Sequence, residues 1–140
     1  MRLVIDTNII FSALIKDSIT RRILLTSEFD FFIPEYVFIE IHKHSEEIME
    51  KSGYDQDDLD TMLDTLISDI NVIPTEEFKK YIPLAFKIMK NIDEDDTSFL
   101  ALALMINGDG IWTNDPHFDK QDKIKVWKTK DIIKLLQIET

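Results

Sequence analysis

The chain has 140 residues, a net charge of −11 and no cysteine. This length predicts a single domain spanning residues 1–140, and 44% hydrophobic with 31% charged residues is the composition of a soluble globular protein. The lack of cysteine excludes disulfides and thiolate metal sites and favours a reducing, cytoplasmic setting. No apolar stretch reaches membrane-spanning length, so we expect no membrane contact. The three glycines do not form a phosphate-binding loop, so no nucleotide cofactor is expected.

Short apolar runs alternate with helical patterns along the whole chain. The first run, residues 3–5, has no polar alternation and is typical of a strand buried on both faces of a parallel sheet. Further strands are predicted at 31–33, 70–73, 111–113 and 125–127. Helices are predicted at 9–15, 19–27, 34–51, 55–69, 74–90 with a break near Pro83, 99–106 and 130–137. This order predicts a three-layer α/β/α sandwich around a central, mainly parallel sheet of about five strands.

Two aspartates stand directly after predicted strands. Asp6 ends the first apolar run, and Asp115 follows the fourth strand in the same manner. Because the carboxyl ends of parallel strands meet at one edge of a sheet, both carboxylates are expected at the same edge. The simpler interpretation is that Asp6 caps a helix, for which Thr7 and Asn8 are also suited, and that Asn-Asp-Pro is an ordinary turn.

Two further acids occupy unusual positions in predicted helices. Glu40 lies among apolar residues, where we expect it to be at least half buried, although it could instead pair with Lys43 or His44 on the helix surface. Asp96 opens the apolar helix 99–106, where Asp93 and Asp96 could together form a variant capping box. Four like charges at one place raise each other's pKa values and call for a cation. Oxygen ligands suit Mg²⁺ or Mn²⁺, and either ion can activate water against a phosphodiester.

These motifs resemble, in order and spacing, those of PIN-domain proteins, which include VapC-type toxins and stand-alone ribonucleases. The resemblance covers nearly the whole chain and rests on Val4-Ile5-Asp6-Thr7-Asn8, on the segment from Pro34 to Glu40, on Asp95-Asp96-Thr97 before Phe99-Leu100-Ala101-Leu102-Ala103, and on Thr113-Asn114-Asp115. Asn114 stands where the family usually has glycine, which leaves the carboxylate of Asp115 in place.

The resemblance implies a metal-dependent endoribonuclease that hydrolyses RNA phosphodiester bonds. It implies that Asp6, Glu40, Asp96 and Asp115 bind one or two Mg²⁺ or Mn²⁺ ions and that Asn8 and Thr113 support them. It also implies a homodimer and, for a toxin, an antitoxin protein as partner. Asp93, Asp95 and Asp119 are candidate accessory acids, and the candidates for phosphate contact are Lys16, Arg21, Arg22, Lys43 and Lys87.

A second hypothesis is a catalytically weak PIN-fold module that binds a protein or RNA partner. The net charge and the acidic segment 55–69 favour a basic protein partner over RNA. A phosphatase with an aspartyl-phosphate intermediate is disfavoured, because such an enzyme would need a second acid shortly after Asp6, and residues 7–9 supply none.

Overall fold

The computed structural model describes residues 1–16 and 18–137, so Asp17 and residues 138–140 of the predicted domain lie outside the described residues. One parallel sheet in the order β3-β2-β1-β4-β5 forms the centre of the molecule. Its strands are β1 (Arg2–Ile5), β2 (Asp30–Pro34), β3 (Ile70–Ile73), β4 (Gly110–Trp112) and β5 (Val126–Trp127). All the predicted strands are therefore confirmed, and the first strand lies in the middle, paired with β2 and β4.

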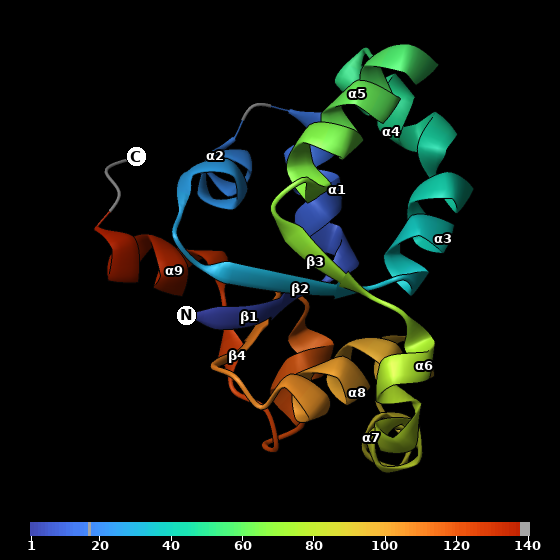
Figure 1. Cartoon of the computed structure of the whole chain (residues 1–140), viewed down its shortest axis with the longest axis vertical. Coiled ribbons are helices and arrows are strands. Elements are labelled where there is room, and N and C mark those ends of the chain that lie inside the picture. The colour runs from blue at the N-terminus through green and yellow to red at the C-terminus, as the bar shows by residue number, and fades with distance from the viewer. Residues whose placement is uncertain (17, 138–140) are drawn as a thin grey trace.

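Helices cover the sheet on both faces (Figure 1). One layer contains α1 (Thr7–Ile15), α2 (Ile19–Thr26), α3 (Tyr36–Lys43), α4 (Ser45–Ser52) and α5 (Gln56–Ile67). The opposite layer contains α6 (Thr75–Phe78), α7 (Ile82–Met89) and α8 (Thr97–Ile106). The remaining elements are the 3₁₀ turns η1 (Lys79–Tyr81), η2 (Glu94–Asp96) and η3 (Pro116–Lys120), and the last helix α9 (Thr129–Leu136). The predicted three-layer sandwich is confirmed.

The hydrophobic core explains why β1 is central. Leu3, Val4 and Ile5 are at most 1% exposed, since both faces of the strand are covered by helices. Ala101 and Ala103 are buried in α8, which packs against β1, β2 and β4. Within the described residues, none of the helices has the length and apolar character that a membrane span requires.

The helix predicted at 34–51 differs from the structure at its start and at one bend. Pro34 ends β2 and opens no helix, since it pairs with Ile73 across the sheet. The helix predicted at 34–51 is divided at His44, so that both α3 and α4 pack on α1. The break predicted near Pro83 is confirmed: α6 and α7 are separated by η1, and Pro83 stands in the first turn of α7, where a missing N–H is tolerated. Gly53 ends α4 at φ 78°, the left-handed conformation that glycine adopts readily.

The sheet has a topological switch point between β1 and β4. The chain leaves β1 into α1 on one face of the sheet, whereas it enters β4 from α8 on the other face (Figure 1). The crevice outside the carboxyl ends of two such strands is where open α/β sheets bind their ligands. Asp6 and Thr113 follow directly after β1 and β4, so the fold places both residues at this crevice.

Candidate metal centre

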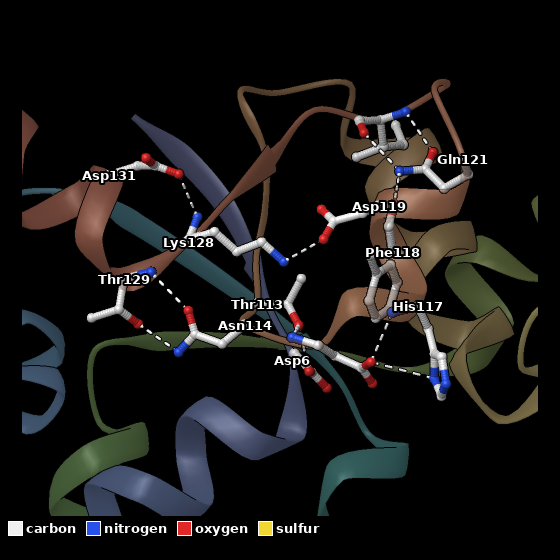
Figure 2. A network of polar contacts seen from close by, with 12 residues as sticks. Asp6, Thr113, Asn114, His117, Phe118, Asp119, Gln121, Lys128, Thr129 and Asp131 are labelled. Atoms are coloured by element: carbon white, nitrogen blue, oxygen red, sulfur yellow. Dashed lines mark hydrogen bonds and ion pairs between the residues drawn. The ribbon is translucent and has the colours of Figure 1, made fainter.

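Asp6 and Thr113 form the buried base of the site. The Thr113 hydroxyl donates a hydrogen bond of 2.7 Å to Asp6 Oδ2 and accepts one of 3.0 Å from the Asp115 backbone N–H (Figure 2). Thr113 is fully buried and Asp6 is 3% exposed. Asp6 does occupy the N-cap position of α1, but its carboxylate is hydrogen-bonded to Thr113. A single hydroxyl therefore orients one acid and holds the backbone of the next.

Glu40 is tied to the same edge by Thr7. The Thr7 hydroxyl donates a hydrogen bond of 2.6 Å to Glu40 Oε1, and the glutamate is partly buried, as predicted. Burial raises the pKa of Glu40, and the hydrogen bond from Thr7 opposes that rise. The alternative was an ion pair between Glu40 and His44. The imidazole of His44 instead lies 3.5 Å from the carboxylate of Glu47. Thr7, expected as a possible cap, instead binds Glu40. Because Thr7 follows Asp6 directly, this hydrogen bond holds the glutamate at the same edge of the sheet as Asp6.

Asp96 ends η2 at the buried start of α8. It is 8% exposed, and its Oδ2 atom is buried without a hydrogen-bond partner among the described residues. Asp93 caps η2, as one alternative predicted: its carboxylate accepts a hydrogen bond from the Asp95 N–H. A buried carboxylate oxygen without a partner costs free energy that a cation would recover.

Burial and neighbouring charges raise the pKa values of Asp6 and Asp96. Burial raises the pKa of Asp6 to about 6, opposed by the Thr113 hydrogen bond and assisted by Asp115 and Glu40. Burial likewise raises the pKa of Asp96 to about 8, and the charges of Asp6, Asp93, Asp115 and Glu40 add to the rise. The charges of Asp115 and Glu40 act on both Asp6 and Asp96, so the structure brings the four predicted acids to one edge of the sheet.

Several other predicted residues lie differently. Asn8 is exposed on the first turn of α1. Asp119 lies 2.9 Å from Lys128 Nζ, which places this candidate accessory acid in an ion pair (Figure 2). Asn114 does not face the acids: it accepts from the Thr129 N–H and donates to the Thr129 hydroxyl at the start of α9.

Arg21 was expected as a candidate phosphate contact, and that expectation is wrong. The residue is 8% exposed, and its guanidinium donates to the carbonyls of Ala13 and Leu14, at 2.7 and 3.3 Å. It thereby satisfies unpaired carbonyls at the end of α1. The other candidates, Lys16, Arg22, Lys43 and Lys87, are exposed.

Two residues that the sequence did not single out also face the acids. His117, in η3, has its Nδ1 atom 3.2 Å from Asp93 Oδ2 and 3.3 Å from Asp115 Oδ1. Tyr36 begins α3. Burial raises the pKa of its hydroxyl, and the charges of Glu40 and Asp95 add to that rise. The position of His117, two residues after Asp115 in a predicted turn, was the available signal for the first. No comparable signal marked Tyr36.

The donor set at this edge fits a divalent cation. It consists of carboxylate oxygens and one imidazole nitrogen, and one of those oxygens is buried without a hydrogen-bond partner in residues 1–16 and 18–137. Hard cations such as Mg²⁺ and Mn²⁺ prefer carboxylate ligands, and Mn²⁺ also accepts imidazole.

Comparison with known proteins agrees with this α/β fold. A family model described as PIN domain matches residues 4–137, so the chain belongs to the PIN-domain family. Its fold is also similar to that of a chain in the crystal structure of VapBC2 from Rickettsia felis bound to a DNA fragment from their promoter. That match has a TM-score of 0.69 at 18% identity and covers 91% of this chain and 98% of the other. No curated protein matches the sequence.

Proposed function

We propose that this PIN-domain protein is a metal-dependent endoribonuclease that hydrolyses RNA phosphodiester bonds. The observation that carries the proposal is the Oδ2 atom of Asp96, which is buried with no hydrogen-bond partner among the residues that the structure describes and lies within a group of carboxylates at the switch point of the sheet. An arrangement that raises its own pKa values is unfavourable without a cation and becomes favourable with one.

Each acid has a role that follows from its surroundings. Asp6 and Asp96, the most buried of the four, are the principal ligands of Mg²⁺ or Mn²⁺. Glu40 positions the ion from α3, and Asp115 completes the ligand set. A bound divalent ion supplies charge neutralisation and activates water for attack on phosphorus.

Neighbouring hydroxyls hold these acids in place. The Thr113 hydroxyl fixes the orientation of Asp6, and the Thr7 hydroxyl does the same for Glu40. Asn8 provides polar support from the exposed first turn of α1. Because these contacts exist within the protein itself, the acids are oriented before a ligand binds.

The same proposal extends to partners. The fold similarity to a chain of the VapBC2 structure supports a role as the toxin of a toxin–antitoxin pair, with an antitoxin protein as partner. A homodimeric state and a cytoplasmic location belong to the same proposal. With a net charge of −11, the protein needs both the metal and local basic side chains to hold RNA. The exposed Lys16, Arg22, Lys43 and Lys87 remain the candidates for phosphate contact.

The test is a cleavage assay on mixed single-stranded RNAs with Mn²⁺, Mg²⁺ or EDTA. The wild type should cleave with either ion and not with EDTA, and Asp6→Asn should reduce the rate by about a hundredfold or more, since a metal ligand supplies several kcal/mol to such reactions. Asp64→Asn, on the exposed side of α5, is the matched control and should cleave at the wild-type rate.

Equal cleavage by Asp6→Asn, or cleavage that survives EDTA, contradicts the proposal. If no RNA is cleaved under any condition, the alternative of a PIN-fold module that binds a protein or RNA partner gains support. The exposed aspartates of α5 favour a basic protein as that partner.

A further inference from the structure

A second group of metal-binding side chains lies beside the four acids. Asp93, Asp96 and His117 each offer one ligand atom, and these three atoms lie within 4.8 Å of one another. The Nδ1 atom of His117 is 3.2 Å from Asp93 Oδ2 and 3.8 Å from Asp96 Oδ2. Ligand atoms bound at about 2.1 Å from one ion are separated by roughly 3.0 Å when adjacent and roughly 4.2 Å when opposite. The observed separations therefore suit a single ion between these residues.

Two of these ligand atoms are buried and lack partners. Asp96 Oδ2 and His117 Nδ1 are both buried without a hydrogen-bond partner among the described residues. The rest of the His117 ring is partly exposed, so only the nitrogen that faces the carboxylates is closed off from solvent. An imidazolium bound as a counter-ion would direct its N–H at one carboxylate, whereas this nitrogen lies among three without such a bond.

The surrounding chain holds all three side chains in place. Asp93 divides its oxygens: Oδ1 accepts from the Asp95 N–H at 3.0 Å, which leaves Oδ2 to face His117. The backbone N–H of His117 donates to Asp115 Oδ1 at 2.9 Å (Figure 2). The next residue, Phe118, is fully buried and anchors the turn. Capping and metal binding are therefore compatible for Asp93, and the imidazole is positioned by the backbone.

We propose that Asp93, Asp96 and His117 bind a divalent transition-metal ion through two oxygens and one nitrogen. The inference rests on the proposed function in that Asp96 is shared with the proposed catalytic centre, but it does not require RNA cleavage. Imidazole favours Mn²⁺ and the later first-row ions over Mg²⁺, which holds its water and prefers oxygen ligands. His117 therefore gives this centre a preference for Mn²⁺ over Mg²⁺.

The direct test detects nitrogen bound to the metal. Untagged, metal-free protein receives less than one equivalent of Mn²⁺, and pulsed electron paramagnetic resonance measures the modulation from a coordinated ¹⁴N nucleus. The wild type should show it. The double variant His42→Ala/His44→Ala removes the other two histidines of the chain and should retain it. If the wild type lacks the modulation, or if the double variant loses it, the proposal is overturned.

The second measurement compares affinities by calorimetry. In His117→Ala, and in the more conservative His117→Asn, the ratio of the Mg²⁺ to the Mn²⁺ dissociation constant should fall about tenfold or more, as expected for loss of a ligand. An unchanged ratio overturns the proposal. Since the resonance experiment uses the wild type and the His42/His44 variant, the test does not depend on the folding of a His117 variant.

Failure of this inference is distinguishable from failure of the proposed function. Cleavage that requires Asp6 and metal, together with Mn²⁺ that shows no ¹⁴N modulation, would refute only the nitrogen ligand. Mn²⁺ that shows the modulation in a protein without ribonuclease activity would refute only the proposed catalysis.

Discussion

The protein has two acidic regions that look alike in sequence and differ in structure. Helix α5 and its cap contain Asp55, Asp57, Asp58, Asp60 and Asp64, all of them exposed. At the edge of the sheet, in contrast, Asp6 and Asp96 are 3% and 8% exposed. The aspartates of α5 stabilise their own helix: Asp55 and Asp58 form a capping box, and Asp60 accepts from Gln56. At the sheet edge, Asp6 and Glu40 accept hydrogen bonds from hydroxyls, and Asp115 accepts one from the His117 N–H. Asp96 Oδ2 has no hydrogen-bond partner within the described part of the chain.

The difference shows that the density of acids is a poor guide to a metal site. An acidic helix in solvent is stabilised by caps and by water, so it needs no cation. A carboxylate at the end of a buried strand or helix loses its water, and the cost is larger when others lie nearby. The position relative to the core therefore matters more than the number of charges.

The largest expected difference between the two acidic regions is in how the stability of the metal-free protein depends on pH. Burial raises the pKa of Asp6 to about 6 and that of Asp96 to about 8, from an ordinary value of 3.8. The folded state then binds these protons more tightly than the unfolded state. Their stabilisation is complete below pH 4 and is lost as the pH rises to about 8. Metal-free protein should thus lose stability between pH 4 and pH 8.

Denaturant unfolding in EDTA at several pH values measures this loss. Asp96→Asn removes one of the two groups, so it should raise the stability near pH 8 by on the order of 1 to 3 kcal/mol relative to the wild type. Asp64→Asn, in exposed surroundings, should leave the pH profile unchanged. If the stability of the wild type rises toward pH 8, or if all three proteins give the same profile, the buried acids do not destabilise the metal-free protein in this way.

A smaller effect is expected from the hydroxyl that orients Asp6. Thr113→Val keeps the shape of the side chain and removes the hydrogen bond to Asp6 Oδ2 and the acceptor for the Asp115 N–H. Affinity for Mn²⁺ should fall about tenfold, the usual effect of losing a group that orients a ligand. Thr113→Ser retains the hydroxyl and should bind within about twofold of the wild type on the same grounds. Equal loss in both variants would assign the effect to packing.

Much of the fold could be predicted from the sequence because local and global signals agree. The run of Leu3, Val4 and Ile5 predicted a strand covered on both faces, and this strand is central. The alternation of strands and helices predicted the layers. The bend at His44 was not predicted, since it depends on how α3 and α4 both pack against α1.

Glu40 could be predicted from its apolar neighbours, and the other site acids because each follows a strand or opens a buried helix. Asp6, Asp96 and Asp115 belong to that class, and the structure places them at one edge. The bond between Thr7 and Glu40 joins residues 33 positions apart and depends on tertiary packing. The approach of His117 to Asp93 depends in the same way on how η3 meets η2. Arg21 shows the opposite failure, because a basic residue that looked available is buried against carbonyls.

The most direct test of the metal centre is a melting experiment on two double variants, Asp6→Asn/Asp96→Asn and Asp57→Asn/Asp64→Asn. Each replaces two carboxyl groups with amides, but only the first pair is buried at the sheet edge. At a Mn²⁺ concentration about 100 times the dissociation constant, binding adds about 2.7 kcal/mol and should raise the melting temperature of the wild type by roughly 10 °C. We predict the same rise for Asp57→Asn/Asp64→Asn and no rise for Asp6→Asn/Asp96→Asn. Equal rises in both double variants would contradict the proposed metal centre.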